Sequence, residues 1–282
     1  MAEEARKAPA APHADAGGDG RVDGASGRAG ATGRAPAAGA AGTRQPVRLK
    51  KPSTWQQYKT LLGKDLTQEF RTKEMLTSMG IYALLVLVVY GAALAQTTST
   101  LDVLQMSGGL LWALIVFTSL LGLNRSFAHE KEQGCLEGIL LVPLDRSVIF
   151  LAKATSNLLF LLAVEVVAVP LFYFFFLTTV TPGESFWLLA VPLFVGTVGV
   201  AGIGTLLSTI TVNTRGKDVM LAVLFIPLVF PLLYACVSAT TVVVVGVEGY
   251  LDAFVPAMAL AAGYDVVMLL ASWVLYDFVV SA

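Results

Sequence analysis

The chain has 282 residues, of which 56% are hydrophobic and 14% are charged, and its formal net charge at pH 7 is -1. This composition excludes an ordinary soluble domain, because about a quarter of the residues in such domains are charged. The net charge is uninformative by itself, and we expect membrane lipid rather than nucleic acid around the protein.

Residues 1–50 have the composition of a disordered cytoplasmic tail. They are rich in Ala, Gly, Pro and Arg and contain no Phe, Trp or Tyr. Such a segment buries too little apolar surface to offset the entropy lost on ordering. Its basic residues are not followed by the apolar stretch of a signal peptide.

Residues 53–76 are predicted to form an amphipathic helix. Apolar residues recur at steps of three and four from Trp55 to Phe70, whereas charged residues such as Asp65 occupy other faces. The segment leads directly into an apolar stretch, so we expect it to lie in the plane of the lipid headgroups. An interfacial anchor and a helix that docks on a partner both fit this pattern.

Residues 79–282 are predicted to form a transmembrane domain. A hydrocarbon core of about 30 Å needs roughly 20 apolar residues per helix. Six stretches meet this requirement: 79–97, 104–123, 152–177, 185–211, 219–243 and 256–279. The expected fold class is therefore an all-α integral membrane protein, with six transmembrane helices after an interfacial helix. Residues 237–248 fit both an extension of the fifth span and a short outer segment that folds back.

The basic residues predict the orientation of these spans. Every Lys and Arg lies in residues 6–73, 125–153 or 215–217. The positive-inside rule places these blocks on the cytoplasmic side, so both termini are expected in the cytoplasm. Arg125 and Lys153 are expected to fix the depth of the helices by extending their charges to the inner interface.

Small residues and prolines mark the fourth and fifth spans. Gly196, Gly199 and Gly202 recur every third residue. This stripe predicts close packing against another helix, either within the chain or in a second copy. Pro227 and Pro231 each remove a backbone donor and predict kinks in the fifth span.

No pattern in the sequence predicts catalysis. The pairs Gly63-Lys64 and Gly216-Lys217 lack the upstream glycine of a nucleotide-binding loop. The two histidines, His13 and His129, lie outside the spans, so we expect no histidine pair that ligates a metal or haem within the membrane.

Two carboxylates fall inside predicted spans, Glu165 and Asp265. An ionisable group at this depth is costly and is a functional hypothesis by default, here that of a proton-coupled transporter. The alternative is that each is protonated or hydrogen-bonded where helices meet. The sequence leaves both interpretations open.

The polar segment 124–144 is predicted to contain a short amphipathic helix. Leu136 and Leu140 lie on one apolar edge, Glu130 and Glu137 lie off it, and Pro143 ends it. Such a helix fits a cleft on a soluble partner, and it also fits a plain surface helix.

The same segment carries a resemblance to a known family. Gly134, Leu136-Glu137, Leu140 and Pro143-Leu144 resemble the cytoplasmic loop of haem-exporter permease B of the cytochrome c maturation system. Other runs of residues are similar to that family in order and spacing: Lys64-Asp65-Leu66, Phe70-Arg71, Gly109 to Trp112, and Arg215-Gly216 ahead of the two prolines. The likeness covers about residues 55–236.

The resemblance implies an ABC-2-like permease in the bacterial inner membrane, a homodimer that works with a separate cytoplasmic ATPase. It also implies a haem-handling membrane subunit and a periplasmic haem chaperone as partners. Haem would be the cargo, and the chain would couple ATP hydrolysis either to its export or to release of the loaded chaperone. The residues expected to contact the ATPase are Arg125, Glu130, Gly134, Leu136, Glu137, Leu140, Pro143, Arg215, Gly216 and Lys217. The alternatives are an ABC-type exporter of a lipid, drug or polysaccharide, and a proton-coupled transporter that uses the two intramembrane carboxylates.

Overall fold

The computed structural model describes residues 53–95, 100–132, 146–177, 184–211, 214, 216–246 and 249–281. All regular structure in these ranges is helical. The helices are α1 (Thr54–Thr72), α2 (Glu74–Leu94), α3 (Thr100–Glu132), α5 (Arg146–Phe176), the 3₁₀ helix η1 (Glu184–Leu189), α6 (Ala190–Thr211), α7 (Lys217–Val245) and α8 (Leu251–Ser281).

Six segments in the described part of the chain are long and apolar enough to cross a membrane. They are Glu74–Leu94, Val103–Ser126, Arg146–Phe176, Trp187–Thr211, Asp218–Val245 and Leu251–Tyr276. The predicted all-α fold with six apolar spans is confirmed. Their ends differ from the prediction by up to six residues: some spans begin or end in the polar flanks, and others stop short of the predicted bounds.

The predicted amphipathic helix ends earlier than expected. Ser53 begins α1 with a capping box, in which Ser53 and Gln56 exchange side chain to backbone hydrogen bonds of 3.3 Å. The helix stops at Lys73, whose backbone is left-handed with φ 52°. This conformation cannot continue a right-handed helix. The first span therefore starts at Glu74, and residues 74–76 belong to it.

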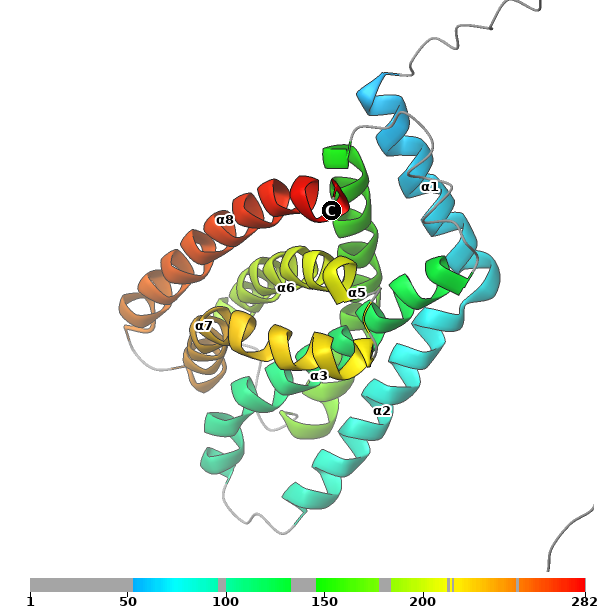
Figure 1. Cartoon of the computed structure of the whole chain (residues 1–282). Helices are drawn as coiled ribbons and strands as arrows, with labels where there is room; N and C mark the ends of the chain where they lie inside the picture. The colour runs from blue at the N-terminus through cyan, green and yellow to red at the C-terminus, as the bar shows by residue number, and fades with distance from the viewer. Residues whose placement is uncertain are drawn as a thin grey trace, which may run out of the picture. The chain divides into compact units, whose positions relative to one another are not determined.

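Helix α6 lies at the centre of the bundle (Figure 1). It packs against α3, α5, α7 and α8. The apolar segment Trp187–Thr211, most of which is α6, is 61% buried, compared with 22% for the apolar segment of α8. The glycine stripe permits this packing. A Cβ atom on Gly196 would overlap the Trp112 ring of α3, and one on Gly204 would overlap Leu123. The stripe thus packs against helices of the same chain.

Helix α7 continues to Val245 and ends at Gly246, which has a φ of 69°. Residues 237–245 therefore extend the fifth span, and the alternative of an outer segment that folds back is wrong for them. Tyr264 of α8 donates a hydrogen bond to the backbone carbonyl of Leu228, between the two prolines of α7. Each proline lacks a backbone N–H, so this part of α7 has fewer hydrogen bonds of its own, and the contact with α8 stabilises it.

We predict that Gly196→Ala destabilises the protein by about 1–3 kcal/mol, the usual cost of overpacking a tight interface. The matched control is Gly263→Ala on α8, where a Cβ meets nothing within 4 Å. Thermal unfolding in detergent should show a lower midpoint for the first variant and an equal or higher one for the second. Equal midpoints for both would contradict the close contact between Gly196 and Trp112.

Candidate functional site

The ends of the helices that carry Arg125, Arg146 and Lys153 form what we call the basic end of the bundle. Here α1 lies against the first turns of α5 and beside the start of α2 (Figure 1). Arg125 and Glu130, two of the residues singled out in the sequence as partner contacts, belong to the last turns of α3 at this end.

Helix α1 turns its polar side toward the protein. Gln57, Asp65 and Glu69 are buried, whereas Trp55 and Phe70 are 61% and 68% exposed. Lys59 places its amine 5.0 Å from the centre of the Trp55 ring, an arrangement in which a cation is attracted to an aromatic face. The outward aromatic face fits the predicted location among headgroups, which remains a prediction.

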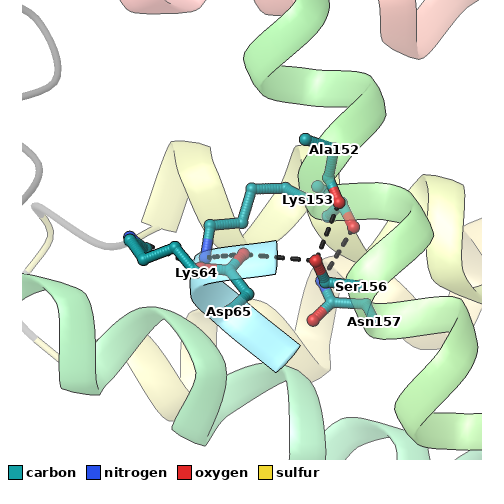
Figure 2. Close-up of polar contacts among 7 residues, drawn as sticks. Lys64, Asp65, Ala152, Lys153, Ser156 and Asn157 are labelled. Carbon is teal, nitrogen blue, oxygen red and sulfur yellow. Dashed lines mark hydrogen bonds and ion pairs between the residues drawn. The ribbon is translucent and has the colours of Figure 1, made fainter. Parts of the chain in front are cut away.

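A buried ion pair joins α1 to α5 (Figure 2). The Lys153 amine lies 3.0 Å from a carboxylate oxygen of Asp65, and both side chains are at most 10% exposed. The Ser156 hydroxyl donates a second bond, 3.2 Å long, to the same oxygen. Lys64 lies 3.4 Å from the other oxygen. These three polar partners compensate for the hydration that the carboxylate loses on burial.

The position of Lys153 corrects the sequence prediction. We expected its amine to extend to the inner interface, but it is buried against Asp65. Asp65 was predicted as part of the polar face of the interfacial helix and of the run Lys64-Asp65-Leu66, without a partner on another helix. The sequence signal for the pair was weak, because a single Lys and a single Asp 88 positions apart form no spacing pattern.

The junction between α1 and α2 is held by two further contacts. Glu69 accepts a 2.8 Å bond from the backbone N–H of Leu76, which would otherwise lack a partner in the first turn of α2. Glu74 accepts a 2.8 Å bond from Arg125 of α3 in an ion pair that is largely exposed. We call residues 54–77, with α1, Lys73 and the first turn of α2, the elbow.

Only part of the predicted partner contact falls within the described residues. Arg125 pairs with Glu74. Glu130 belongs to α3, although its side chain is not described, and Gly216 precedes α7 with a φ of 74°. Lys217 is the first residue of α7, again without a described side chain. The remaining predicted contacts lie outside the described residues: Gly134, Leu136, Glu137, Leu140, Pro143 and Arg215.

The two intramembrane carboxylates lie in different surroundings. Glu165 of α5 accepts a 2.6 Å hydrogen bond from Thr197 of α6. Asp265 of α8 lies against Gly199 of α6, and its Oδ1 atom has no hydrogen-bond partner among the described residues. Each is buried where helices meet. The described contacts do not join them to each other, and their role in transport remains a prediction.

Sequence reasoning missed two polar contacts that cross the bundle. Asn157 of α5 donates a 2.9 Å bond to Thr205 of α6, and the Trp112 indole of α3 donates one of the same length to Thr240 of α7. Their distances along the sequence leave no periodic signal. No group of three or more His, Cys, Asp or Glu residues in the described part of the chain is arranged to hold a metal ion.

We predict that Lys153→Met lowers the free energy of unfolding by about 3 kcal/mol, because it removes the nearer and more buried of the two amines beside the Asp65 carboxylate. The double variant Asp65→Asn with Lys153→Met should recover most of this loss, since it also removes the negative charge of the buried carboxylate. Thermal unfolding of both variants in detergent measures the difference. Equal losses in the single and double variants would show that the two side chains do not interact.

Comparisons with known proteins place this architecture in a family. The family model described as CcmB protein matches residues 56–279. "Heme exporter protein B" of Pseudomonas aeruginosa is 27% identical over 176 residues, which are 62% of this chain and 77% of that protein. The protein of the same name from Rhodobacter capsulatus is 29% identical over 129 residues, 46% of this chain and 58% of its own length. With most of its length matched, including α1, all six apolar spans and the basic end, the chain belongs to the CcmB family.

Proposed function

We propose that this chain is the membrane subunit of an ABC-type haem exporter that serves cytochrome c maturation. The family match over residues 56–279 carries the proposal, together with two similar proteins named for haem export. These names favour haem over lipid, drug or polysaccharide as the cargo. The chain has no nucleotide-binding loop of its own, so ATP hydrolysis is assigned to a separate subunit.

The ATPase is proposed to dock at the basic end of the bundle. Helix α3 runs to Glu132, six residues beyond the apolar window that ends at Ser126. At 1.5 Å per residue it extends about 9 Å past the membrane-spanning part. This projection supports a contact with a soluble partner through α3 and residues 133–145. The proposed orientation places this end, and both termini, in the cytoplasm of a bacterial cell.

The proposal includes the other members of the complex by family likeness: a second copy of this chain, a haem-handling membrane subunit and a periplasmic haem chaperone. Haem is the cargo in this proposal and not a resident cofactor of the chain. The helices would transmit ATP-driven motion of the partner across the membrane, either to move haem or to release the loaded chaperone.

Cells that lack this gene should contain little covalently haem-bound c-type cytochrome, and the intact gene should restore it. Haem staining of membrane proteins measures the cytochrome, and haem bound to the purified periplasmic chaperone shows at which step the pathway stops. Normal cytochrome in the deleted strain would contradict the function in cytochrome c maturation and would favour a permease with another cargo.

Charge reversal at the proposed docking segment, Glu130→Lys with Glu137→Lys, should lower the amount of ATPase that co-purifies with the chain. Charges across an interface steer and select the partner, so reversing them places like charges together. Insertion into the membrane should be unchanged. The control is Asp252→Lys, an exposed acidic position in the first turn of α8. An unchanged yield of complex in the first variant would remove this segment from the docking surface.

A further inference from the structure

Helix α1 separates its charges by sign. The sequence gives it two carboxylates, Asp65 and Glu69, and both are buried in the protein. Its cations are placed differently: Lys64 lies 3.4 Å from Asp65, whereas Lys59 and Arg71 are exposed. The exposed surface of α1 therefore carries positive charge and no carboxylate of its own helix.

Exposed aromatic rings lie on the same side of α1 as Lys59. Trp55 lies four residues before Lys59 and Phe70 eleven residues after it, so the helical turn places all three within about 60° around the axis. Arg71 follows Phe70 directly. Aromatic rings beside cationic side chains are typical of helices that lie among lipid headgroups.

The elbow keeps α1 beside the ends of two spans (Figure 1). Asp65 pairs with Lys153, which lies inside the apolar segment Arg146–Phe176. Glu69 accepts a bond from Leu76 in the first turn of α2, at the start of the first apolar segment. These contacts bring the exposed side of α1 to the level at which both spans leave the hydrocarbon of the membrane.

We propose that the exposed side of α1 binds anionic phospholipid headgroups through Lys59 and Arg71, with Trp55 and Phe70 inserted between the lipids. Each Lys or Arg near a membrane surface attracts lipids with net negative charge. The predicted location of α1 says nothing about that charge, which the burial of both carboxylates now assigns. This binding depends on the membrane location of the chain and not on its cargo or its ATPase.

A lipid fits this surface better than an acidic segment of a soluble protein, the other source of negative charge. Trp55 and Phe70 are large apolar groups on the exposed side, and they need an apolar environment next to the charges. The headgroup region offers both, because its phosphates lie directly above the acyl chains. An acidic peptide would bind Lys59 and Arg71 and leave the rings in water.

The test measures how strongly brominated lipids quench the fluorescence of Trp55. The purified chain is placed in phosphatidylcholine vesicles in which a minor share of the lipid is brominated and is either phosphatidylglycerol or phosphatidylcholine. The difference between the unaltered chain and Trp55→Phe isolates the signal of Trp55. Two variants are compared: Lys59→Gln with Arg71→Gln removes both charges, and Lys59→Arg with Arg71→Lys keeps them.

The matched control is Trp187 of η1, isolated in the same way with Trp187→Phe. Its side chain is 83% exposed, and residues 154–214 around it contain no Lys or Arg. It should be quenched equally by the two lipids, because no cation near it in the sequence selects between them.

We expect Trp55 to favour brominated phosphatidylglycerol over brominated phosphatidylcholine by about fivefold or more. The preference should disappear in the Gln variant and persist in the variant that keeps the charges. It should also weaken in about 1 M salt, where charges are screened within about 3 Å. Both substituted positions are exposed, so the midpoint of thermal unfolding should stay close to that of the unaltered chain.

Three results would overturn the proposal. The first is equal quenching of Trp55 by the two lipids in the unaltered chain. The second is a preference that survives in the Gln variant, which would show that Lys59 and Arg71 do not select the lipid. The third is no quenching by either lipid, which would show that this side of α1 faces water or a protein. The measurement uses the chain alone, so its outcome is independent of the cytochrome and ATPase experiments.

Discussion

The charges of Asp65 and Lys153 constrain the arrangement of the helices at the basic end. A carboxylate and an amine with little exposure must be paired, because each loses several kcal/mol of hydration. Asp65 meets this requirement with Lys153 and Ser156 of α5, and it can do so only if α1 presents its polar side to the bundle. The same orientation turns Trp55 and Phe70 outward. One ion pair thus sets both the docking of α1 and the apolar surface that it offers to the surroundings.

The centre of the bundle depends on close approach. Gly196 and Gly204 let α6 lie against large side chains of α3, and two polar residues of α6 find partners on α5. Thr197 binds Glu165, and Thr205 binds Asn157. The Thr205 hydroxyl, which accepts from Asn157, donates its own proton to the carbonyl of Ala201 one turn earlier in α6. Within an apolar environment such contacts favour one register of the helices, because a shifted register would leave polar groups unsatisfied.

These two features bear on the function proposed above. A permease that is driven by a separate ATPase needs a surface outside the membrane and a connection from that surface to its helices. The extension of α3 beyond its apolar segment supports the first requirement, and the direct packing of α3 and α5 against α6 supports the second. The same specific contacts that stabilise the bundle make its helices move as rigid parts, because closely packed helices shift as units and do not deform continuously.

The sequence by itself determined the all-α class, the six spans, the amphipathic helix before them and the resemblance that the family comparison supports. These properties depend on the length of the apolar stretches and on the spacing of apolar residues close in sequence, and both are properties of the sequence itself. Only the tertiary structure decided that Lys153 is buried against Asp65, that the glycine stripe packs within the chain, that α1 stops at Lys73 and that Asn157 meets Thr205. Pairings between single residues far apart in sequence leave no periodic pattern, so their partners are selected by the packing of the helices.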